Sequence, residues 1–404
     1  MPTTKVRNDV ANDLLIVGMQ TAPGTEAVPT FMMDGKPDID WYPATTIEDE
    51  ATGTYMTQVT PTQGLPANTG SWGEIALSYE RVASILRLIC KAGRNPFSGS
   101  GPDYLYKQAL DIIGDDAELA TVFFGTKGLL EKFTDLRFSE LNLSWDPDSG
   151  GSWKATPTAM VGKGDAPAAL ETTVSSATTT AITVAGPLTP SALVGGYVFI
   201  GGDNNLAGAR LISANTATVI TVDTPYGVAP TVGAKVRVGY VPPAGIVPIT
   251  QNRIKAAGTK VFLDPYGGTI GTNQILQRII SGNVSINLNL DNKAFSENEF
   301  DRSGVYGRGS AMVTGQLVIE ADKIDEINQL KRMDRPKLRI QKTGPDIAPG
   351  VPMLFQIDVP ELVFTKVSKG TRKNNKTRTL TWQAVSRTLP VEFQTRTTLA
   401  QLPN

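Results

Sequence analysis

The clearest strand signal in the chain is Ile279-Ile280-Ser281-Gly282-Asn283-Val284-Ser285-Ile286-Asn287-Leu288-Asn289-Leu290. From Val284 onward apolar and polar residues alternate, which is typical of a strand with one buried face and one hydrated face. A polar loop follows over residues 291–310, and a second alternating strand is predicted from Met312 to Glu320. Runs of this kind, punctuated throughout by glycine and proline, predict a mainly β fold.

Residues 51–164 and residues 246–395 form two units with the same order of predicted secondary-structure elements. Each unit is predicted to contain a strand, a long loop, a second strand, an amphipathic helix, further strands and a closing hairpin. The closing hairpins are Leu136–Leu143 facing Trp153–Val161, and Glu361–Val367 facing Thr379–Val385. The other strands are predicted at Thr54–Thr60, Trp72–Ser78, Ala120–Phe124, Leu338–Lys342, Met353–Val367 and Arg378–Ser386. The shared order predicts an internal duplication, although the two units have low identity.

The helix of each unit is marked by a change of period. In the first unit, Val82, Ile85, Leu86 and Ile89 recur at i, i+3, i+4 and i+7, which is one face of a helix over residues 78–91. The second helix is predicted over residues 321–333, with an apolar side formed by Ile324, Ile327, Leu330 and Met333. Both units also carry tryptophans that we expect in the core: Trp72, Trp145, Trp153 and Trp382.

Residues 165–245 have a different composition, rich in Thr, Ser, Val, Ala and Gly. Short β runs recur there, at Ala181–Val184, Tyr197–Ile200, Arg210–Ser213, Val219–Val222 and Lys235–Tyr240. They predict a small all-β module, a sandwich or a barrel, inserted between the two units. Residues 1–50, which prolines interrupt, are predicted to be an irregular arm or wrapped extension, and residues 396–404 a C-terminal tail.

The composition of the 404 residues argues against several kinds of site. The chain has no histidine, which removes the commonest general base near neutral pH and the commonest metal ligand. The single cysteine, Cys90, allows no intrachain disulfide and is expected to be a packing residue. A net charge of −1 gives no overall attraction to nucleic acid or membranes. No apolar run is long enough to span a membrane, so we expect no membrane contact.

The second unit resembles the tail tube proteins of long-tailed bacteriophages, especially the larger, internally duplicated kind. The resemblance rests on the run from Ile279 to Leu290, the long loop, Gly315-Gln316-Leu317-Val318-Ile319-Glu320, the helix and the closing hairpin. In the first unit, Gly70-Ser71-Trp72 and the segment Arg137 to Trp145 with Gly150-Gly151 are similar in kind. The resemblance covers residues 51–164 and 246–395, and its features are patterns of element order rather than diagnostic sequence motifs.

This resemblance implies a virion structural protein with two tube-type β-sandwich domains, each with one packed helix. Such domains share their sheets around a ring, and the rings stack into the tube through which the viral genome is ejected. A duplicated chain needs three copies for a pseudo-sixfold ring, so homotrimeric rings are expected. The implied partners are further copies of the chain, tape-measure and tail-terminator proteins, and DNA that passes through the lumen without specific binding. The implied location is the virion tail, built from protein made in the host cytoplasm.

Candidate contact residues for assembly come from two segments. The loop 291–310 is long for a connection between two strands, and its mixed charges suit docking between rings. Its candidate inter-ring residues are Phe295, Phe300, Asp301, Arg302, Tyr306 and Arg308. The second segment is a basic run across a hairpin tip predicted around Gly370, with Lys369, Arg372, Lys373 and Lys376. For this run, phosphate contact, contact with an acidic patch on a neighbouring subunit and plain solvation are all open.

The acidic residues are interpreted as structural, and we expect no catalytic residue, metal or cofactor. The first acidic group, interpreted as a solvated loop or a subunit contact, consists of Asp111, Asp115, Asp116 and Glu118. Asp146 and Asp148 flank a proline and are interpreted as parts of a turn.

Two alternatives stay open. One is a receptor-binding or adhesive β-protein of a phage tail or cell surface, with residues 165–245 as the binder. The other is a carbohydrate-active enzyme that uses two carboxylates at a defined separation. Polymerisation separates a tube subunit from an adhesin, because a tube subunit forms stacked rings.

Overall fold

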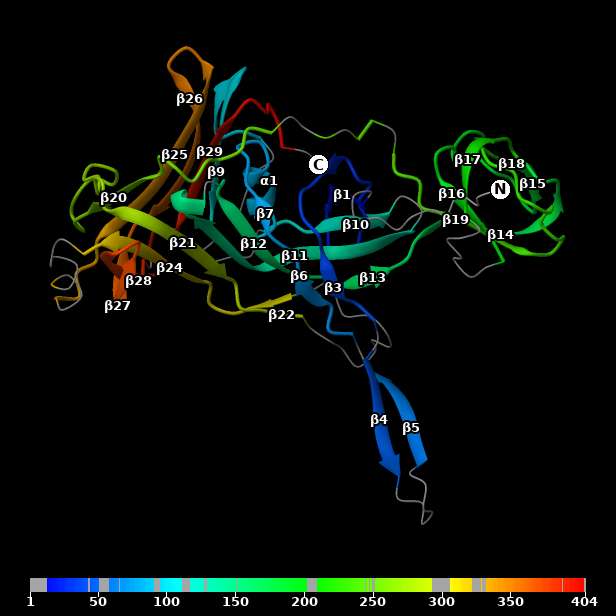
Figure 1. Ribbon diagram of the computed structural model, residues 1–404, viewed down its shortest axis with the longest axis horizontal. Helices are drawn as coiled ribbons and strands as arrows, with labels where there is room; N and C mark the ends of the chain where they lie inside the picture. The colour runs from blue at the N-terminus through cyan, green and yellow to red at the C-terminus, as the bar shows by residue number, and fades with distance from the viewer. Residues whose placement is uncertain are drawn as a thin grey trace.

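The computed structural model describes residues 13–42, 44–50, 58–64, 66–90, 95–110, 117–126, 129–149, 151–201, 209–243, 245, 246, 248, 251–292, 306–321, 328, 332–386 and 388–402. The chain is mainly β, as the alternating runs predict. Its body consists of two sheets, with a small barrel at one end (Figure 1). A two-stranded hairpin of β4 (Ala44–Glu50) and β5 (Gln58–Gly64) projects from the body.

A large sheet of 13 strands forms one layer of the body. Its strands are β1 (Asp13–Met19), β2 (Phe31–Met32), β3 (Asp38–Asp40), β6 (Thr69–Ser71), β7 (Ile75–Ala76), β10 (Ala120–Thr126), β11 (Leu129–Trp145), β12 (Lys154–Met160), β13 (Lys163–Asp165), β21 (Ile279–Asn287), β24 (Met312–Glu320), β27 (Leu362–Arg372) and β28 (Asn375–Ala384). The main order is β2-β1-β10-β11-β21-β24-β28-β27, and β12 adds β6, β7 and β3 on the side of β11. Strands from both halves of the chain therefore share one sheet.

The second sheet has the order β20-β25-β26-β29-β9-β8. Its strands are β8 (Ser98–Ser100), β9 (Asp103–Ala109), β20 (Lys260–Asp264), β25 (Lys337–Ala348), β26 (Val351–Val359) and β29 (Glu392–Thr397). The main hydrophobic core lies between the two sheets, where the rings of Trp145 and Trp153 stack at 4.5 Å. Phe355 of β26 meets Trp153 edge to face at 5.3 Å, which couples the two layers. The four tryptophans expected in the core are all buried, as is Cys90.

The first predicted helix is α1 (Val82–Arg87), which is shorter than the expected 78–91. All six of its residues are buried, including Arg87, whose guanidinium pairs with Glu118. The second predicted helix falls mostly outside the described residues, although Asn328 and Arg332 are helical. Met333 was expected on its apolar side, and that expectation is wrong, because Met333 is 80% exposed and has a φ of 54° that ends any helix.

The predicted module is a closed barrel with its own core. Its strands are β14 (Ala168–Ala177), β15 (Ala181–Val184), β16 (Tyr197–Ile200), β17 (Arg210–Asn215), β18 (Val219–Val222) and β19 (Lys235–Gly239). They close in the order β14-β15-β18-β17-β16-β19. The core of the barrel forms a hydrophobic cluster separate from that of the body, and Figure 1 shows the barrel beyond the end of the large sheet. Of the two expected forms, the structure has the barrel.

Some sequence-based expectations are wrong. Residues 1–50 were expected to be irregular throughout, but their described part contains the strands β1 to β4, and Val17 of β1 is completely buried. The described part of the strand expected at Thr54–Thr60 belongs to the projecting hairpin rather than to a main sheet. The strand expected at Met353–Val367 is two strands in different sheets, because Pro360 separates β26 from β27. The strand expected at Trp72–Ser78 is reduced to β7.

Candidate assembly interface

The two halves of the chain meet edge to edge in the large sheet. The C-terminal part of β11 pairs antiparallel with β21, from Glu140 opposite Asn287 to Trp145 opposite Gly282. On the core side of this pairing Leu143 lies opposite Val284, and both side chains are completely buried. On the other side the Asn287 amide donates a hydrogen bond to the Glu140 carboxylate. The junction is therefore a complete β interface, with an apolar side and a polar side.

Each side of this junction carries the same arrangement of strands. Outward from the junction, one side has β21-β24-β28-β27 and the other has β11-β12-β6-β3. In chain order, β3, β6, β11 and β12 of the first half match β21, β24, β27 and β28 of the second. Followed in one direction, the sheet runs β3-β6-β12-β11 and then β21-β24-β28-β27. Each half therefore shows its first, second, fourth and third strand in that order. The junction joins the third strand of one half to the first strand of the other.

The matched hairpins contain the same irregularity. The register of β11 with β12 shifts at Ser139, and the register of β27 with β28 shifts at Thr365. Each of these residues donates its hydroxyl to a carbonyl of the paired strand at 3.3 Å, Ser139 to Thr158 and Thr365 to Thr381. An extra residue in one strand bends and twists the hairpin locally. The two halves therefore bend their closing hairpins at matched positions.

The matched second strands share a close backbone approach. A Cβ placed on Gly70 of β6 would lie 2.0 Å from the carbonyl oxygen of Asp38. A Cβ placed on Gly315 of β24 would lie 2.4 Å from the carbonyl oxygen of Asn283. Asp38 and Asn283 occupy matched places in β3 and β21, and each glycine follows a threonine in the sequence. Only glycine fits at both places, which adds a local match to the shared topology.

The strands β27 and β3 stand at the two ends of this arrangement. Within the described part of the chain, β27 pairs only with β28, and β3 pairs only with β6. By the matching, β27 corresponds to β11 and β3 corresponds to β21. These are the two strands that form the internal junction. The molecule thus presents, at opposite ends, the two kinds of edge that already pair inside it.

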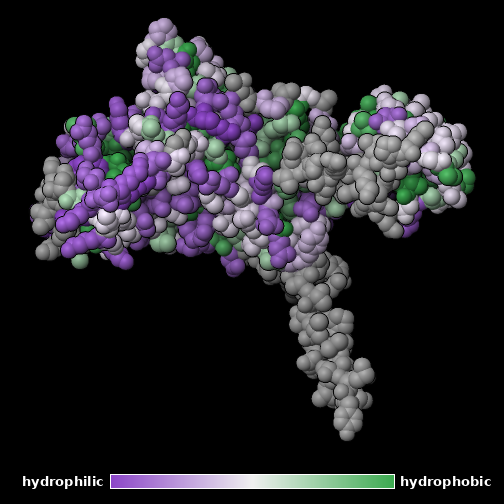
Figure 2. Space-filling view, viewed as in Figure 1, coloured by the Kyte–Doolittle hydropathy of each residue, from purple (hydrophilic) through white to green (hydrophobic). Residues whose placement is uncertain are grey.

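The face of the large sheet turned away from the core is polar across the junction. One row runs over β12, β11, β21, β24 and β28, and it consists of Thr156, Asn142, Ser285, Thr314 and Gln383. Each side chain in this row is uncharged and at least partly exposed. The next row, which includes Leu143, Val284 and Trp382, is buried. Hydrophilic residues gather over this part of the body in Figure 2. The alternation expected for residues 284–290 thus produces a hydrated face.

The basic hairpin is partly neutralised within the chain. Nη2 of Arg372 donates to both carboxylate oxygens of Asp146, at 2.7 and 2.8 Å, and lies 3.2 Å from Asp148. Nζ of Lys373 lies 2.9 Å from Asp148. The hydrogen bond from Lys373, with the charges of Lys373 and Arg372, lowers the pKa of Asp148. Asp148 belongs to the turn η2 (Pro147–Ser149) between β11 and β12, and Asp146 directly precedes it, so the turn expected there is confirmed.

The tip of the basic hairpin differs from the expected one. Gly370 lies inside β27, and the turn is Lys373-Asn374, whose φ angles are 48° and 67°. Two successive left-handed residues make the type I′ turn that suits the twist of a hairpin. Lys369 and Lys376 of this hairpin are exposed. Arg372 and Lys373 therefore have partners in the same chain, while the two lysines stay on the surface near the edge.

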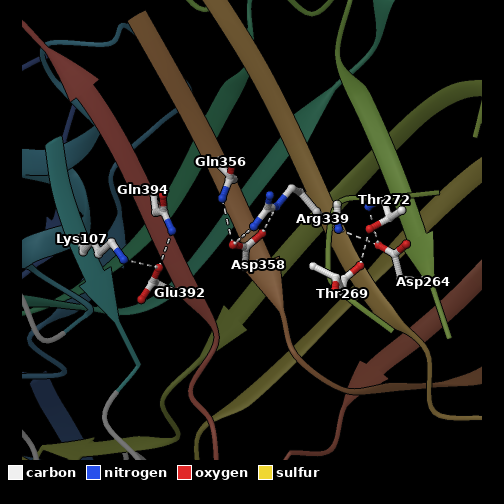
Figure 3. Close-up of polar contacts among 10 residues, drawn as sticks. Lys107, Asp264, Thr269, Thr272, Arg339, Gln356, Asp358, Glu392 and Gln394 are labelled. Carbon is white, nitrogen blue, oxygen red and sulfur yellow. Dashed lines mark hydrogen bonds and ion pairs between the residues drawn. The ribbon is translucent and has the colours of Figure 1, made fainter. Parts of the chain in front are cut away.

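Carboxylates of the second sheet are used in cross-strand contacts (Figure 3). Asp358 accepts hydrogen bonds from the Arg339 guanidinium at 2.7 and 2.8 Å and from Gln356 at 2.8 Å. Lys107 of β9 lies 3.6 Å from Glu392 of β29, on strands that come from the first and second halves of the chain. The planar two-point contact of Arg339 with Asp358 holds the neighbouring strands β25 and β26 in register. Of these contacts, the ion pair of Lys107 with Glu392 joins strands of the two halves, and the contact of Arg339 with Asp358 lies within the second half.

The candidate inter-ring residues are only partly described. Phe295, Phe300, Asp301 and Arg302 lie outside the described residues, as do Asp111, Asp115 and Asp116. Tyr306 and Arg308 lie in β23 (Tyr306–Arg308), which pairs with β22 (Leu290–Asn292) at the base of the loop. The matched place in the first half, between β3 and β6, holds the hairpin β4–β5. Both halves therefore insert a hairpin between their first and second strands.

Sequence reasoning missed both the junction and the role of β3. Alternation assigns each residue to a face, but it does not say which strand lies alongside. One signal was present, because Thr69-Gly70 and Thr314-Gly315 repeat the same pair at matched places.

Within the described ranges, no three His, Cys, Asp or Glu side chains are grouped to hold a metal ion. Nor does any described helix have the length and apolar character needed to cross a membrane. No family model matches the chain, and no curated protein matches its sequence.

Proposed function

We propose that this protein is the subunit of a self-assembling tube, of the kind that forms the tail tube of a long-tailed bacteriophage. The observation that carries the proposal is the junction of β11 with β21 between two matched halves. A head-to-tail contact of one edge type with another closes into a ring when the rotation allows it. Closure also covers the sheet edges that a free subunit exposes.

The proposal treats the two halves as copies of one tube domain. The shared strand order, the hydroxyl contacts at Ser139 and Thr365 and the two close glycines support a duplication. If one internal junction corresponds to one step around a sixfold ring, three copies complete the ring. A trimer with alternating halves is the expected assembly.

The polar face of the large sheet would line the channel. Asn142, Ser285 and Thr314 continue across the junction, so the wall would stay hydrated from one half to the next. Sequence-independent DNA binding depends on lysine and arginine side chains that contact the phosphates. The row of hydroxyls and amides across the junction offers no cationic side chain to DNA phosphates, so this part of the wall lets DNA pass without holding it. The hairpins inserted between first and second strands are then available for contact between rings, and the ends of the tube for tape-measure and terminator proteins.

The barrel supports a second role for part of the chain. It has its own core, and Figure 1 shows it beyond the end of the large sheet. A separate module on the outer surface of a tube is placed to contact the surroundings, such as a receptor on a cell. This role would be added to tube formation and does not replace it.

Electron microscopy of the purified chain tests the proposal directly. The expected result is rings and stacked tubes with a central channel, with three copies per ring by native mass spectrometry. A protein that stays monomeric at high concentration and physiological salt would count against the tube and favour the adhesive alternative. Six copies per ring would overturn the duplication.

A further inference from the structure

The two halves of the chain also indicate the register in which one copy meets the next. We propose that β27 of one copy pairs antiparallel with β3 of the next copy. In this pairing Ser368 lies opposite Asp40, Lys369 opposite Ile39 and Gly370 opposite Asp38. The inference rests on the proposed function, to which it adds the strands, the residues and the register of the contact.

The position of β27 follows from its matched bulge. In β11 the extra residue is Ser139, and Asn142, three residues later, pairs with Ser285 of β21. In β27 the extra residue is Thr365, and three residues later stands Ser368. Ser368 therefore takes the place of Asn142 at the free edge.

The position of β3 follows from the strands between it and its own hairpin. Ser285 pairs with Thr314, which pairs with Gln383 of β28. Asp40 pairs with Thr69, which pairs with Met160 of β12. Gln383 and Met160 are matched, because each stands two residues after the threonine that accepts the bulge hydrogen bond, Thr381 or Thr158. Asp40 therefore takes the place of Ser285. The register of the internal junction can be applied unchanged to the contact between β27 of one copy and β3 of the next.

The charges at the two free edges are complementary. Asp38 and Asp40 are exposed on β3, and Lys366 and Lys369 are exposed on β27. Lys366 stands two residues from Ser368 on the same face, so it lies diagonally across from Asp40 in the proposed pairing. Cross-strand pairs of opposite charge stabilise a sheet, and like charges destabilise it.

The same charges discourage the wrong edges from meeting. Glu140 of β11 holds the place that Lys366 holds in β27. A β11 edge set against β3 would bring Glu140 close to Asp40, which is a repulsive contact. Lys369 also occupies the place of the buried Leu143, and a lysine on the core side of an edge strand hinders unspecific pairing of the free subunit. The edge chemistry therefore favours β27 with β3 over the other combinations.

Disulfide trapping between copies tests the register. We would mix a Ser368→Cys chain with an Asp40→Cys chain, assemble them and oxidise them mildly. Directly opposite strand residues fall in the range of Cα separations that a disulfide requires, about 4.4–6.8 Å. The expected product is a covalent dimer of one chain of each kind on a non-reducing gel. Cys90 is buried, and the unsubstituted chain reports any background from it.

Two matched variants control the trapping. Ser368→Cys mixed with Asp38→Cys is displaced by two residues, a separation of about 7–8 Å, and should cross-link at least about tenfold more slowly. Asn142→Cys with Ser285→Cys in one chain sets the same pair at the internal junction, and it should form an intrachain disulfide in the unassembled subunit. The second variant shows that the geometry and the oxidant are adequate.

A charge reversal gives an independent reading of the same contact. Lys366→Glu should reduce ring formation, and Lys366→Glu combined with Asp40→Lys should restore it. Rings that form without the Ser368–Asp40 cross-link, or that prefer the Asp38 pair, would overturn the register while leaving the proposed function intact. Absence of rings and tubes from every variant and from the unsubstituted chain would overturn the proposed function and this inference with it.

Discussion

Arg372 is the side chain that ties the closing hairpins of the two halves together. It reaches from the end of β27 to Asp146 at the end of β11, and its Nη1 also donates to the Ser281 hydroxyl at 3.2 Å. The contact bridges residues 226 positions apart in the chain. At the residue scale, the internal junction therefore has a polar clamp at the edge of its backbone pairing.

Removing this clamp should lower the stability of the subunit by a modest amount. The Arg372 side chain is 28% exposed and that of Asp146 is 40% exposed, so solvent screens the pair. We expect Arg372→Gln to lower the free energy of unfolding by about 0.5–1 kcal/mol, and less at high salt. Urea unfolding of the dilute, unassembled chain measures the change. Lys376→Gln on the same hairpin is the control, and an equal loss in that variant would show that only general charge matters.

The Asp148 contact should depend on pH in the acidic range. Lys373 lowers the pKa of Asp148 in the folded chain relative to the unfolded chain. A lowered pKa of an acid contributes stability that is present above the unfolded pKa and is lost as the pH falls through the folded pKa. We expect the melting temperature of the natural chain to exceed that of Asp148→Asn near neutral pH, and the difference to shrink in the acidic range as the Asp148 carboxylate becomes protonated. A difference that grows on acidification would contradict this assignment.

At the scale of elements, the two halves each place a hairpin between their first and second strands. β4–β5 projects from the body in the first half, and β22–β23 begins the loop 291–310 in the second. The two hairpins occupy matched places in the two halves, and Figure 1 shows β4–β5 extending away from the body. Both are therefore candidates for contact between stacked rings, which extends the sequence-based expectation from one segment to two.

Replacing Phe300 and Tyr306 with serine should weaken stacking and leave the fold intact. Large aromatic side chains contribute most where they become buried against a partner. We expect the double variant to form rings but shorter tubes, as electron microscopy would show, with an unchanged melting temperature of the subunit. Cleavage of this loop by a protease should be slower in tubes than in free subunits. Equal cleavage in both states would argue against a stacking role.

The sequence could predict a strand where its buried side chains are apolar, and it missed strands whose buried side chains are polar. β24 was predicted at its observed bounds, because Val313, Leu317 and Ile319 are apolar and buried. β29 was missed because two of its inward residues are threonines, Thr395 and Thr397, which are buried but do not read as apolar. In β9 the buried Gln108 hides the alternation in the same way, and its amide donates to a carbonyl of α1.

At the scale of the whole molecule, the sequence could not fix which edges meet. Local patterns predicted strands at β11 and β21, but the pairing of β11 with β21 is a contact between distant segments. Any alternating strand with the same faces could have taken that place, since alternation sets the face and not the neighbour. The sequence therefore could not predict the candidate interface, although the two segments that form it had both been predicted as strands.

The barrel should be dispensable for tube formation. Its first strand and its last strand pair with each other, with Ala168 opposite Gly239, so the chain enters and leaves the barrel at neighbouring positions. A short Gly/Ser linker can therefore replace residues 169–238 without moving the body. Outside this span, β13 keeps its pairing with β11, and Tyr240 keeps its stack on Phe123 at 4.3 Å.

We expect the deletion variant to keep the cooperative unfolding of the body and to form tubes of the same lumen and smaller outer diameter. Negative-stain microscopy measures both diameters. The separate core of the barrel is the physical reason, because removing it leaves the main core between the two sheets intact. A folded variant that stays monomeric would place the barrel in the assembly interface. A wider lumen would place the barrel inside the tube, which contradicts a channel lined by the polar face of the large sheet.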